Sequence, residues 1–463
     1  MRDRHFFAPS FRLKRLNVAL LILLAAGPVH AATYYVATTG NDANAGTLAA
    51  PFRTIAKGSQ RLAAGDTLYI RRGTYAEAMW HGQGGFVFRN GTSMSAMTRY
   101  AAYPGEEVIV KPSTNAFVIW FSRTADSIEI SGLVIDGTHV TSYAVKIDGS
   151  YASNQWPRVR LLRNEIRYGR MGIGGGGGCE IIGNNIHHMK QYGIYTAFDN
   201  GLMEGNIFHD NGRLAIHHFS QNKTVNNWIF RNNIFYRNGK GYYSVTLDKW
   251  YRDPAVIISR GTNNKLYNNL FYDNYAGIHV GLGAVDALIA NNTVFGSDTY
   301  GIKVSSAYSG SLNARIVNNI AWGNKSSQIF DNATNTTLQA NLTTDPLVVN
   351  AAAGDFHLRS GSPAINAGVN LYSAGVTKDF EGKPRPQTGP FEIGAYEYGG
   401  STPPPPPGPV TDLNGDGITN VADVQIAVNQ AVGAAACAAG DVNKDGVCNV
   451  SDIQLVINKA LGL

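Results

Sequence analysis

Histidine and basic side chains recur at one place in a repeated strand pattern in the middle of the chain. When the second apolar strand of each repeat is aligned on its isoleucine, the next column contains His217, His279 and Lys303, with Ile258 in the intervening repeat. Arg260 lies two residues further along that strand. Alternate residues of a strand face opposite sides, so the four cationic side chains are expected on one outward face.

Side chains of these types could remove a proton next to a carboxylate. A histidine or a lysine can act as the base, and an arginine or a calcium ion can neutralise the carboxylate as negative charge develops. That chemistry is β-elimination from a uronate. The alternative is that these cations are ordinary solvated residues, because exposed strand faces carry charge by default. His187, His188 and His218 are expected to be core or ladder residues.

Aromatic residues and one long insertion lie beside this candidate site. Tyr195 shares the column of His217, and Phe219 shares that of Arg260, which would offer aromatic faces to sugar rings. The insertion from Gly239 to Pro254 precedes the strand of Arg260, and insertions on one side of a solenoid often build its binding face. It supplies three further candidate substrate-binding residues, Lys249, Trp250 and Arg252.

Two segments near the C-terminus have the spacing of an EF-hand calcium loop. Each offers oxygen ligands at six positions and a glycine for the sharp turn; the predicted ligands are Asp412, Asn414, Asp416, Ile418, Asn420, Asp423, Asp441, Asn443, Asp445, Val447, Asn449 and Asp452. A helical pattern follows each loop. We therefore expect a small all-α unit that binds two calcium ions. One more calcium ion could bind at the strand site.

The elements that must position the strand site repeat along the central part of the chain. An asparagine before an apolar residue recurs at steps of 21 residues from Asn164 through Asn185 to Asn206, and at a step of 36 from Asn232 to Asn268. Short β-rich runs bounded by glycine or asparagine, with a period of about 22 residues, describe one coil of a β-solenoid. Asparagines at the bends could hydrogen-bond their copies in the next coil. A leucine-rich repeat would need a leucine framework, which is missing, so an all-β, stacked parallel β-helix is expected.

The N-terminal part, from Tyr34 to about Tyr103, has a different pattern. Residues 51–64 begin with Pro-Phe-Arg-Thr-Ile and predict a helical cap, and residues 65–75 turn into strands. A solenoid needs its open end covered, so we expect the helix to cap the first coil. Together with the closing segment at 355–397, these motifs resemble pectate-lyase-like right-handed parallel β-helix proteins.

That resemblance covers roughly residues 33–398 and implies the fold more directly than the activity. The superfamily includes polysaccharide lyases, glycoside hydrolases and uronan epimerases, and a lysine or arginine often has the base role in its lyases. The polygalacturonase signatures and the Asp-Pro-His-Asp of alginate epimerases are absent from this sequence. The clustered aspartates that hold calcium in family-nine pectate lyases have no match on the coils.

The C-terminal pair of loops resembles the duplicated repeat of type I dockerins. That family folds around two calcium ions and docks onto a cohesin module, so the resemblance implies a cohesin-type or cell-surface protein partner. Here Val421-Ala422 and Val450-Ser451 occupy the tenth and eleventh loop positions, where familiar cellulosomal dockerins favour a serine-threonine pair.

Four regions are expected along the chain. Residues 1–31 have the basic start and short apolar stretch of a signal peptide, which predicts secretion. Residues 32–399 form the β-helix, with the cap and first coils at 32–103. Residues 400–409 contain five prolines and form an extended linker, and residues 410–463 form the dockerin-like unit. No other segment is apolar enough to span a membrane, and a monomer is expected.

The charge of the chain is unevenly divided. The net charge of the whole chain is +6. Residues 1–31 have five basic residues and one acidic residue, a net charge of +4, and the tail from Asp412 has six aspartates and two lysines, a net charge of −4. The β-helix and linker therefore have a net charge of +6. A basic body suits an anionic polysaccharide, whereas no basic stripe interleaved with aromatics indicates nucleic acid. Cys437 and Cys448 are close enough in sequence to pair, and Cys179 is expected to be buried.

The leading interpretation is a secreted lyase that cleaves an acidic polysaccharide of the pectin or alginate type, with Lys303, Arg260, His279 and His217 as catalytic candidates. A second interpretation is a non-catalytic carbohydrate-binding or surface-attached β-helix. A glycoside hydrolase is third, because hydrolysis requires two facing carboxylates and the outward columns supply none.

Overall fold

The computed structural model describes residues 31–80, 86–149, 156–220, 223–244, 249–306, 310–386 and 389–399, together with 411, 413, 419–437, 440–442 and 447–460 of the tail. The predicted signal peptide, except Ala31, and the predicted linker lie outside the described residues. So do six of the predicted calcium ligands, Asp412, Asn414, Asp416, Ile418, Asn443 and Asp445.

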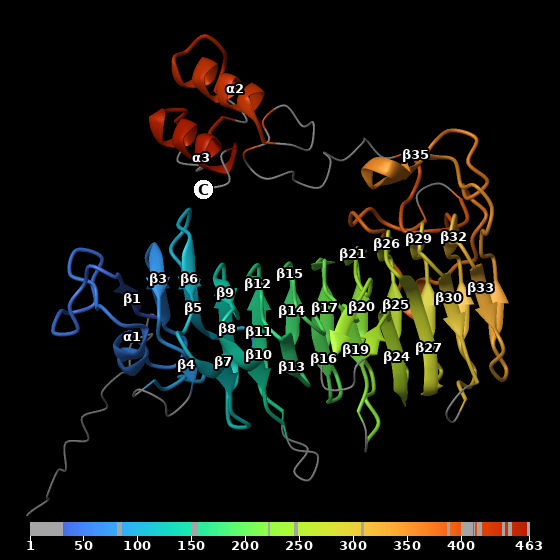
Figure 1. Cartoon of the computed structure of the whole chain (residues 1–463), viewed down its shortest axis with the longest axis horizontal. Coiled ribbons are helices and arrows are strands. Elements are labelled where there is room, and N and C mark those ends of the chain that lie inside the picture. Colours follow the sequence, from blue (N-terminus) through green and yellow to red (C-terminus); the bar gives the residue numbers. More distant parts are fainter. Residues whose placement is uncertain are drawn as a thin grey trace, which may run out of the picture.

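The predicted parallel β-helix is confirmed. Successive coils each add one strand to three long parallel sheets, and the coils follow one another in chain order along the solenoid (Figure 1). Sheet A has twelve strands: β1 (Thr33–Val36), β2 (Thr67–Ile70), β5 (Thr98–Ala102), β8 (Asp126–Ser131), β11 (Arg158–Leu162), β14 (Glu180–Ile182), β17 (Leu202–Glu204), β20 (Ile229–Arg231), β25 (Lys265–Tyr267), β28 (Leu288–Ala290), β31 (Arg315–Val317) and β34 (Thr337–Gln339).

Sheets B and C have ten strands each. Sheet B contains β3 (Gly73–Tyr75), β6 (Val108–Val110), β9 (Val134–Asp136), β12 (Glu165–Arg167), β15 (Asn185–His187), β18 (Ile207–His209), β21 (Ile234–Tyr236), β26 (Leu270–Tyr272), β29 (Thr293–Phe295) and β32 (Ile320–Trp322). Sheet C contains β4 (Met79–Trp80), β7 (Asn115–Phe121), β10 (Val140–Ile147), β13 (Met171–Gly175), β16 (Ile194–Thr196), β19 (Ile216–His218), β24 (Pro254–Thr262), β27 (Ala276–Val285), β30 (Tyr300–Val304) and β33 (Ser327–Asp331).

The remaining elements cap and decorate this solenoid. The predicted N-terminal cap contains α1 (Ile55–Arg61), which begins after Thr54, whose side chain accepts a hydrogen bond from the Lys57 N–H. Two antiparallel pairs interrupt the coil pattern: β22 (Tyr242–Ser244) with β23 (Lys249–Tyr251), and β35 (Val348–Asn350) with β36 (Asp355–Leu358). The closing segment also has 3₁₀ turns η2 (Ala351–Ala353) and η3 (Tyr372–Ala374).

Buried asparagines hold the coils in register. The Oδ1 atom of Asn184 accepts hydrogen bonds from both the backbone N–H and the side-chain amide of Asn164, at 2.9 and 3.0 Å. The same double contact repeats from coil to coil through Asn206, Asn233, Asn269, Asn292, Asn319 and Asn341. This asparagine ladder confirms the predicted hydrogen bonding between copies. The residue before each ladder asparagine takes a left-handed turn; in Asn232-Asn233 the first has φ 57°.

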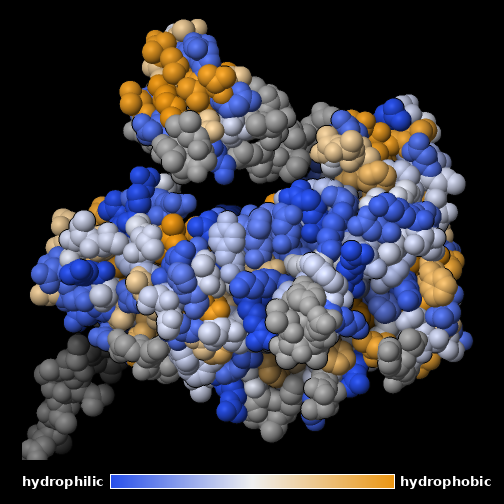
Figure 2. All heavy atoms as spheres, in the orientation of Figure 1, coloured by the Kyte–Doolittle hydropathy of each residue, from blue (hydrophilic) through white to orange (hydrophobic). Residues whose placement is uncertain are grey.

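The interior is packed with aliphatic and aromatic side chains that stack in the same way as the strands. Ile173, Ile194 and Ile216 are fully buried at matching positions of sheet C, and Phe208, Phe235 and Phe271 stack in sheet B. The surface seen in Figure 2 is mainly hydrophilic along the solenoid, with scattered apolar side chains. Among the described residues, no helix is long and apolar enough to cross a membrane.

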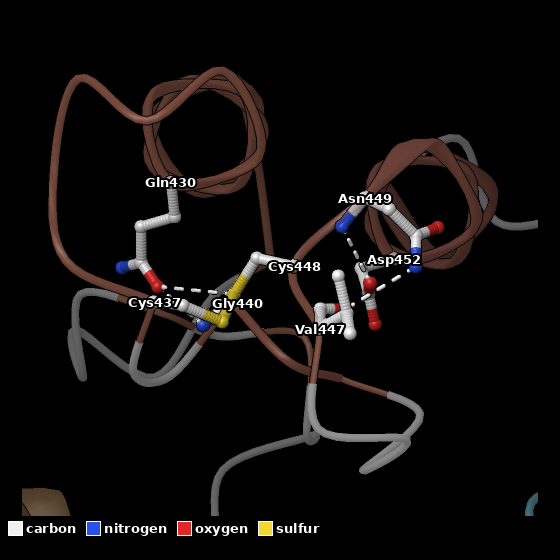
Figure 3. The surroundings of a disulfide bond; sticks show 7 residues. All are labelled: Gln430, Cys437, Gly440, Val447, Cys448, Asn449 and Asp452. Carbon is white, nitrogen blue, oxygen red and sulfur yellow. Dashed lines mark hydrogen bonds between the residues drawn. A yellow bond between two sulfur atoms is a disulfide. The ribbon is translucent and has the colours of Figure 1, made fainter.

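The described part of the tail has two helices, α2 (Val421–Ala431) and α3 (Val450–Ala460), at the predicted helical patterns. Cys437 and Cys448 form a disulfide, as their proximity in the sequence suggested (Figure 3). Cys179 is buried and free, also as predicted.

Candidate functional site

One column of side chains runs along the outer face of sheet C, one from each strand. The register places in it Trp80, Trp120, Lys146, Gly174, Tyr195, His217, Ile257, His279, Lys303 and Phe330, which we call the sheet C column. From Trp120 to Lys303, the residues on either side along each strand point into the core and are buried. Neighbouring strands lie about 4.8 Å apart, so the column is an extended track of aromatic and cationic groups.

Two predicted positions need correction. The intervening residue between His217 and His279 is Ile257, not Ile258, which is fully buried in the core. Arg260 does not share a column with Phe219, because β19 pairs with β24 through His217 and Ile257, which brings Phe219 level with Ser259. At Arg260, which has φ 44°, the register between β24 and β27 shifts, because β27 has one more residue than β24 between the pairs Ser259–Gly281 and Gly261–Ala284. The β-bulge in β27 disrupts the ladder locally, and the left-handed conformation redirects the Arg260 side chain.

Arg260 nevertheless lies beside the predicted group. Its guanidinium carbon lies 5.3 Å from the ring centre of Phe219, a cation–π distance, and Arg260 is exposed. Phe219 is parallel to the His217 ring, with centres 5.2 Å apart. The Arg260 side chain therefore lies on the same outer face as Phe219 and His217, although its backbone conformation differs from the predicted strand.

His279 and Lys303 are neighbours in the sheet C column and differ in chemistry. The Nε2 atom of His279 lies 3.0 Å from Ser305 Oγ. Burial, together with the positive charge of Lys303, lowers the pKa of His279 to about 4, so its imidazole is neutral at pH 7. The Nζ atom of Lys303 lies 5.5 Å from the ring centre of Tyr300 and 5.8 Å from that of Phe330. A neutral base and a cation thus stand side by side.

Gly281 leaves the space that this arrangement needs. A Cβ atom at this position would lie 2.8 Å from His279 Nε2 and 3.1 Å from Ser305 Oγ. The absence of a side chain therefore allows the contact between His279 and Ser305.

His217 lies in an aromatic setting two strands from His279. The ring centres of Tyr192 and Tyr195 are 5.0 and 4.7 Å from that of His217. Burial, with the charge of Arg213, lowers the pKa of His217 to about 4. Within the described part of the chain its Nδ1 atom has no hydrogen-bond partner. His217 is therefore a neutral, apolar-packed imidazole at the surface of the track.

The predicted insertion adjoins His217 through Arg213. The Arg213 guanidinium donates to Asp253 at 2.6 Å and to the Tyr192 hydroxyl at 2.6 Å, and lies 4.3 Å from the Tyr251 ring centre. The β22–β23 hairpin therefore sits next to the sheet C column, as expected from the insertion.

The three binding candidates of the insertion are exposed. Trp250 is 64% exposed, the Nζ atom of Lys249 lies 5.3 Å from the Tyr251 ring centre, and Arg252 lies 5.9 Å from that of Tyr275. They lie on or next to the hairpin rather than in the sheet C column.

The N-terminal half of the track was not predicted from the sequence. Trp80 and Trp120 contact edge to face with centres 5.5 Å apart, and Trp120 Nε1 donates to Asp148 at 2.8 Å. These strands precede the asparagine repeats, so the alignment on repeated isoleucines did not reach them. The signal available was the alternation of apolar and aromatic residues in β7.

Two of the three histidines that we expected to be core or ladder residues have that role. His218 is buried in the core, where its Nε2 donates to the Val225 carbonyl and its Nδ1 lies 2.8 Å from Thr196 Oγ1. His187 stacks on His209 in a ladder on the outer face of sheet B. His188 is exposed at a turn, which corrects its placement as a core or ladder residue.

The described calcium candidates of the tail cluster at the helix starts. Asp423 is fully buried and accepts hydrogen bonds from the N–H groups of Leu413 and Asn420, at 2.7 and 2.8 Å. Asp452 is also buried and accepts from Asn449 N–H at 3.0 Å (Figure 3). Asp441 and Val447 belong to the described residues as well. Asp423 completes a capping box at the start of α2, and Asp452 makes the corresponding contact with the Asn449 N–H at the start of α3.

Two family models match the solenoid. Residues 34–165 match one described as Pel9A-like, right-handed β-helix region, and residues 122–249 match one described as right-handed β-helix region. The solenoid is a right-handed parallel β-helix, and its N-terminal part is similar to Pel9A-like β-helix regions. Pectate lyase Pel9A is 14% identical, with 79% of this chain and 96% of that chain covered and a TM-score of 0.50. A rhamnogalacturonan lyase is 17% identical over 76% of this chain and 99% of that chain, with a TM-score of 0.44.

One relative found by sequence comparison has low identity to this chain. The uncharacterized protein YwoF of Bacillus subtilis (strain 168) is 27% identical over 337 residues, which cover 64% of this chain and 69% of that protein. At 14% identity the likeness to pectate lyase Pel9A shows the fold alone, so the reaction has to be argued from the site.

Proposed function

We propose that this protein is a secreted lyase that cleaves an acidic polysaccharide by β-elimination on the sheet C column. The observation that carries the proposal is the pair of His279 and Lys303, a neutral imidazole beside a lysine on an aromatic track. The basic charge of the β-helix favours a polyuronate as the substrate.

The reaction divides between the two side chains. The carboxylate of the uronate lies against Lys303, with Arg260 as a second cation nearby, which stabilises the charge that develops when the adjacent C–H bond is broken. His279 takes that proton. The C–H electron pair becomes the carbon–carbon double bond as the glycosidic C–O bond breaks, and the departing oxygen takes up a proton. In this proposal His279 is the base, whereas the resemblance alone favoured Lys303 in that role.

The two alternative functions are less well supported. A glycoside hydrolase needs two carboxylates about 5–9.5 Å apart, and none of the ten positions of the sheet C column has a carboxylate. A non-catalytic carbohydrate-binding protein would use the aromatic track but would not require a neutral base beside a lysine. The epimerase reaction also begins with proton abstraction, so its product must be tested separately.

The deciding experiment incubates the secreted protein, with calcium, against a panel of polyuronates that includes pectate, rhamnogalacturonan and alginate. Ultraviolet absorbance reports unsaturated sugar ends, and proton NMR of the polymer reports epimerisation. We expect absorbance to rise on one polyuronate. Binding to a polymer without either product would instead support the carbohydrate-binding function.

The aromatic end of the track gives a separate prediction. Trp120 lies six strands from His279, about 29 Å away along the column, so only a long chain can touch both. Trp120→Ala should raise KM for the polymer about fivefold, from the loss of about 1 kcal/mol of ring contact, and leave kcat unchanged. Short oligosaccharides should show no change, and Tyr372→Ala, an exposed residue outside the column, is the control. An equal effect on short substrates would contradict an extended track.

We also propose that the tail is a dockerin-like calcium unit. Its loops offer twelve oxygen-bearing positions for two ions, and the buried Asp423 and Asp452 fit the twelfth position of each. Calcium would supply only structural cross-linking there, by drawing each loop onto the start of its helix.

Titration of the full chain tests this tail. We expect two calcium ions per chain, with one site lost in Asp423→Ala and both in Asp423→Ala with Asp452→Ala. Asp345→Ala, an exposed carboxylate of the β-helix region, should leave both. Uptake that is the same in the double variant and the wild type would exclude these loops as the sites.

The tail offers an apolar surface for a protein partner. Val421 is 78% exposed and Val450 is 75% exposed, at the tenth loop positions, and Figure 2 shows apolar side chains grouped on this unit. We therefore include a cohesin-type or cell-surface protein in the proposal, with the polysaccharide site on the β-helix and attachment through the tail.

A further inference from the structure

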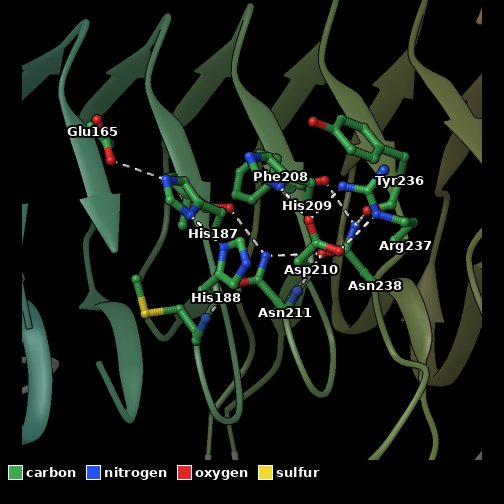
Figure 4. A network of polar contacts seen from close by, with 12 residues as sticks. Glu165, His187, His188, Phe208, His209, Asp210, Asn211, Tyr236, Arg237 and Asn238 are labelled. Carbon is green, nitrogen blue, oxygen red and sulfur yellow. Dashed lines mark hydrogen bonds and ion pairs between the residues drawn. The ribbon is translucent and has the colours of Figure 1, made fainter. Parts of the chain in front are cut away.

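Three histidines meet on the outer face of sheet B, on a different sheet from the proposed lyase site (Figure 4). His187 and His209 occupy the same outward column in β15 and β18, and their rings stack with centres 4.6 Å apart. His188 follows His187 at the turn. One nitrogen from each of the three rings lies within 4.8 Å of those of the other two, and the Nδ1 atoms of His187 and His188 are 2.7 Å apart.

Two of these rings also form hydrogen bonds with carboxylates. The Nε2–H of His187 donates to Glu165 at 3.2 Å, and the Nδ1–H of His209 donates to Asp210 at 2.7 Å. This leaves a lone pair on Nδ1 of His187 and on Nε2 of His209. A histidine that ligates a metal almost always donates its other N–H to such an acceptor, which sets the tautomer and the ring orientation.

The two carboxylates are themselves held by arginines. Arg167 donates to Glu165 at 2.8 Å, and Arg237 donates to Asp210 at 2.7 and 2.6 Å. These contacts fix the position of each carboxylate, so the acceptor on the far side of each ring is held in place.

An aromatic ladder alone does not account for His188. The column continues from His209 to Tyr236 and Tyr272 as parallel rings, so His187 and His209 could serve stacking only. His188 stands outside that column, at a left-handed turn with φ 55° that Asp210 and Arg237 share in the next two coils. Stacking in the column therefore does not place His188, yet its ring lies edge to face with His187, with centres 4.9 Å apart.

We propose that His187, His188 and His209 form a binding site for one divalent transition metal ion, of the class of Zn²⁺. Neutral imidazoles suit zinc, copper and nickel rather than calcium or magnesium. A tetrahedral site with Zn–N distances of about 2.0–2.1 Å separates its ligands by about 3.4 Å. The Nδ1 atoms of His187 and His188, now 2.7 Å apart, would therefore need to part by about 0.7 Å. Three histidines leave the fourth position for water, which is the ligand set of an open zinc site.

The test is competition for Zn²⁺ between the full chain and a chromophoric chelator, in excess calcium so that the acidic tail loops are saturated. The wild type should bind one Zn²⁺, and His188→Ala should weaken binding at least about 30-fold, within the range seen when ligands or their supports are lost. His188 is exposed, so the variant should keep the melting temperature of the metal-free wild type. His139→Ala, an exposed histidine outside the cluster, is the matched control and should bind as the wild type does.

Cobalt gives a second readout. Co²⁺ in the same site should show the visible absorption of a four-coordinate ion in the wild type and in His139→Ala, and lose it in His188→Ala and in His209→Ala. The proposal is wrong if the wild type binds no Zn²⁺ above the level of His188→Ala, or if both cluster variants bind as tightly as the wild type. Neither result depends on whether the sheet C column catalyses β-elimination.

Discussion

His279→Ala should reduce kcat/KM on the responsive polyuronate by a factor of about 100 or more, because loss of a positioned general base costs about 10²–10⁴ in rate. Burial and Lys303 hold the pKa of His279 at about 4, so the base is unprotonated at neutral pH and activity should decline only below about pH 5 as the imidazole takes up a proton. The pH profile of kcat/KM reports the pKa values of the free enzyme, so its acid limb, the fall in activity at low pH, measures the pKa of this base.

The same experiment separates the base from its partner. Lys303→Met should lower kcat by about 10²–10³ through loss of charge stabilisation, without removing the acid limb of the pH profile. Lys325→Met, an exposed lysine paired with Asp298, is the control and should leave the rate unchanged. If Lys303→Met removes the limb and His279→Ala retains it, the base is Lys303 and the proposed division of roles is reversed.

The second large effect concerns stability. Asn269→Ala should lower the free energy of unfolding by about 3 kcal/mol or more, because it removes one rung of the asparagine ladder. The buried Asn269 side chain accepts the N–H and side-chain amide of Asn233, both at 2.9 Å, and donates to Asn292 and to the Phe230 carbonyl. Each buried polar group left without a partner costs about 1–3 kcal/mol.

Thermal and urea unfolding, followed by circular dichroism, measure the change. The matched control is Asn263→Gly, which removes an exposed asparagine bonded to Asn227 at 3.0 Å and keeps a residue that tolerates the left-handed turn at φ 59°. We expect the control to change the free energy of unfolding by less than about 1 kcal/mol. Equal losses in Asn263→Gly and Asn269→Ala would show that burial of the ladder is not what stabilises the coils.

Local repetition explains why the fold could be predicted. Each coil of a solenoid contacts only its neighbours, so the same asparagine and the same isoleucine must recur wherever the chain turns or packs. Asn206, Asn233 and Ile278 therefore appear in the sequence at positions that identify their structural roles. The column of His217, His279 and Lys303 follows from the same alternation, since it depends only on neighbouring residues of short strands.

The sequence by itself therefore determined the stacked coils, the cap, the two tail helices and most of the cationic column. Tertiary structure alone decided the rest, because it depends on how coils of unequal length come into register. Arg260 takes a left-handed conformation opposite a bulge in β27, which the repeat pattern does not indicate. Trp120 joins the track from a strand that precedes the asparagine repeats. His188 meets His209 only because a turn in one coil stacks against a strand of the next, a contact between residues 21 positions apart that no local pattern reports.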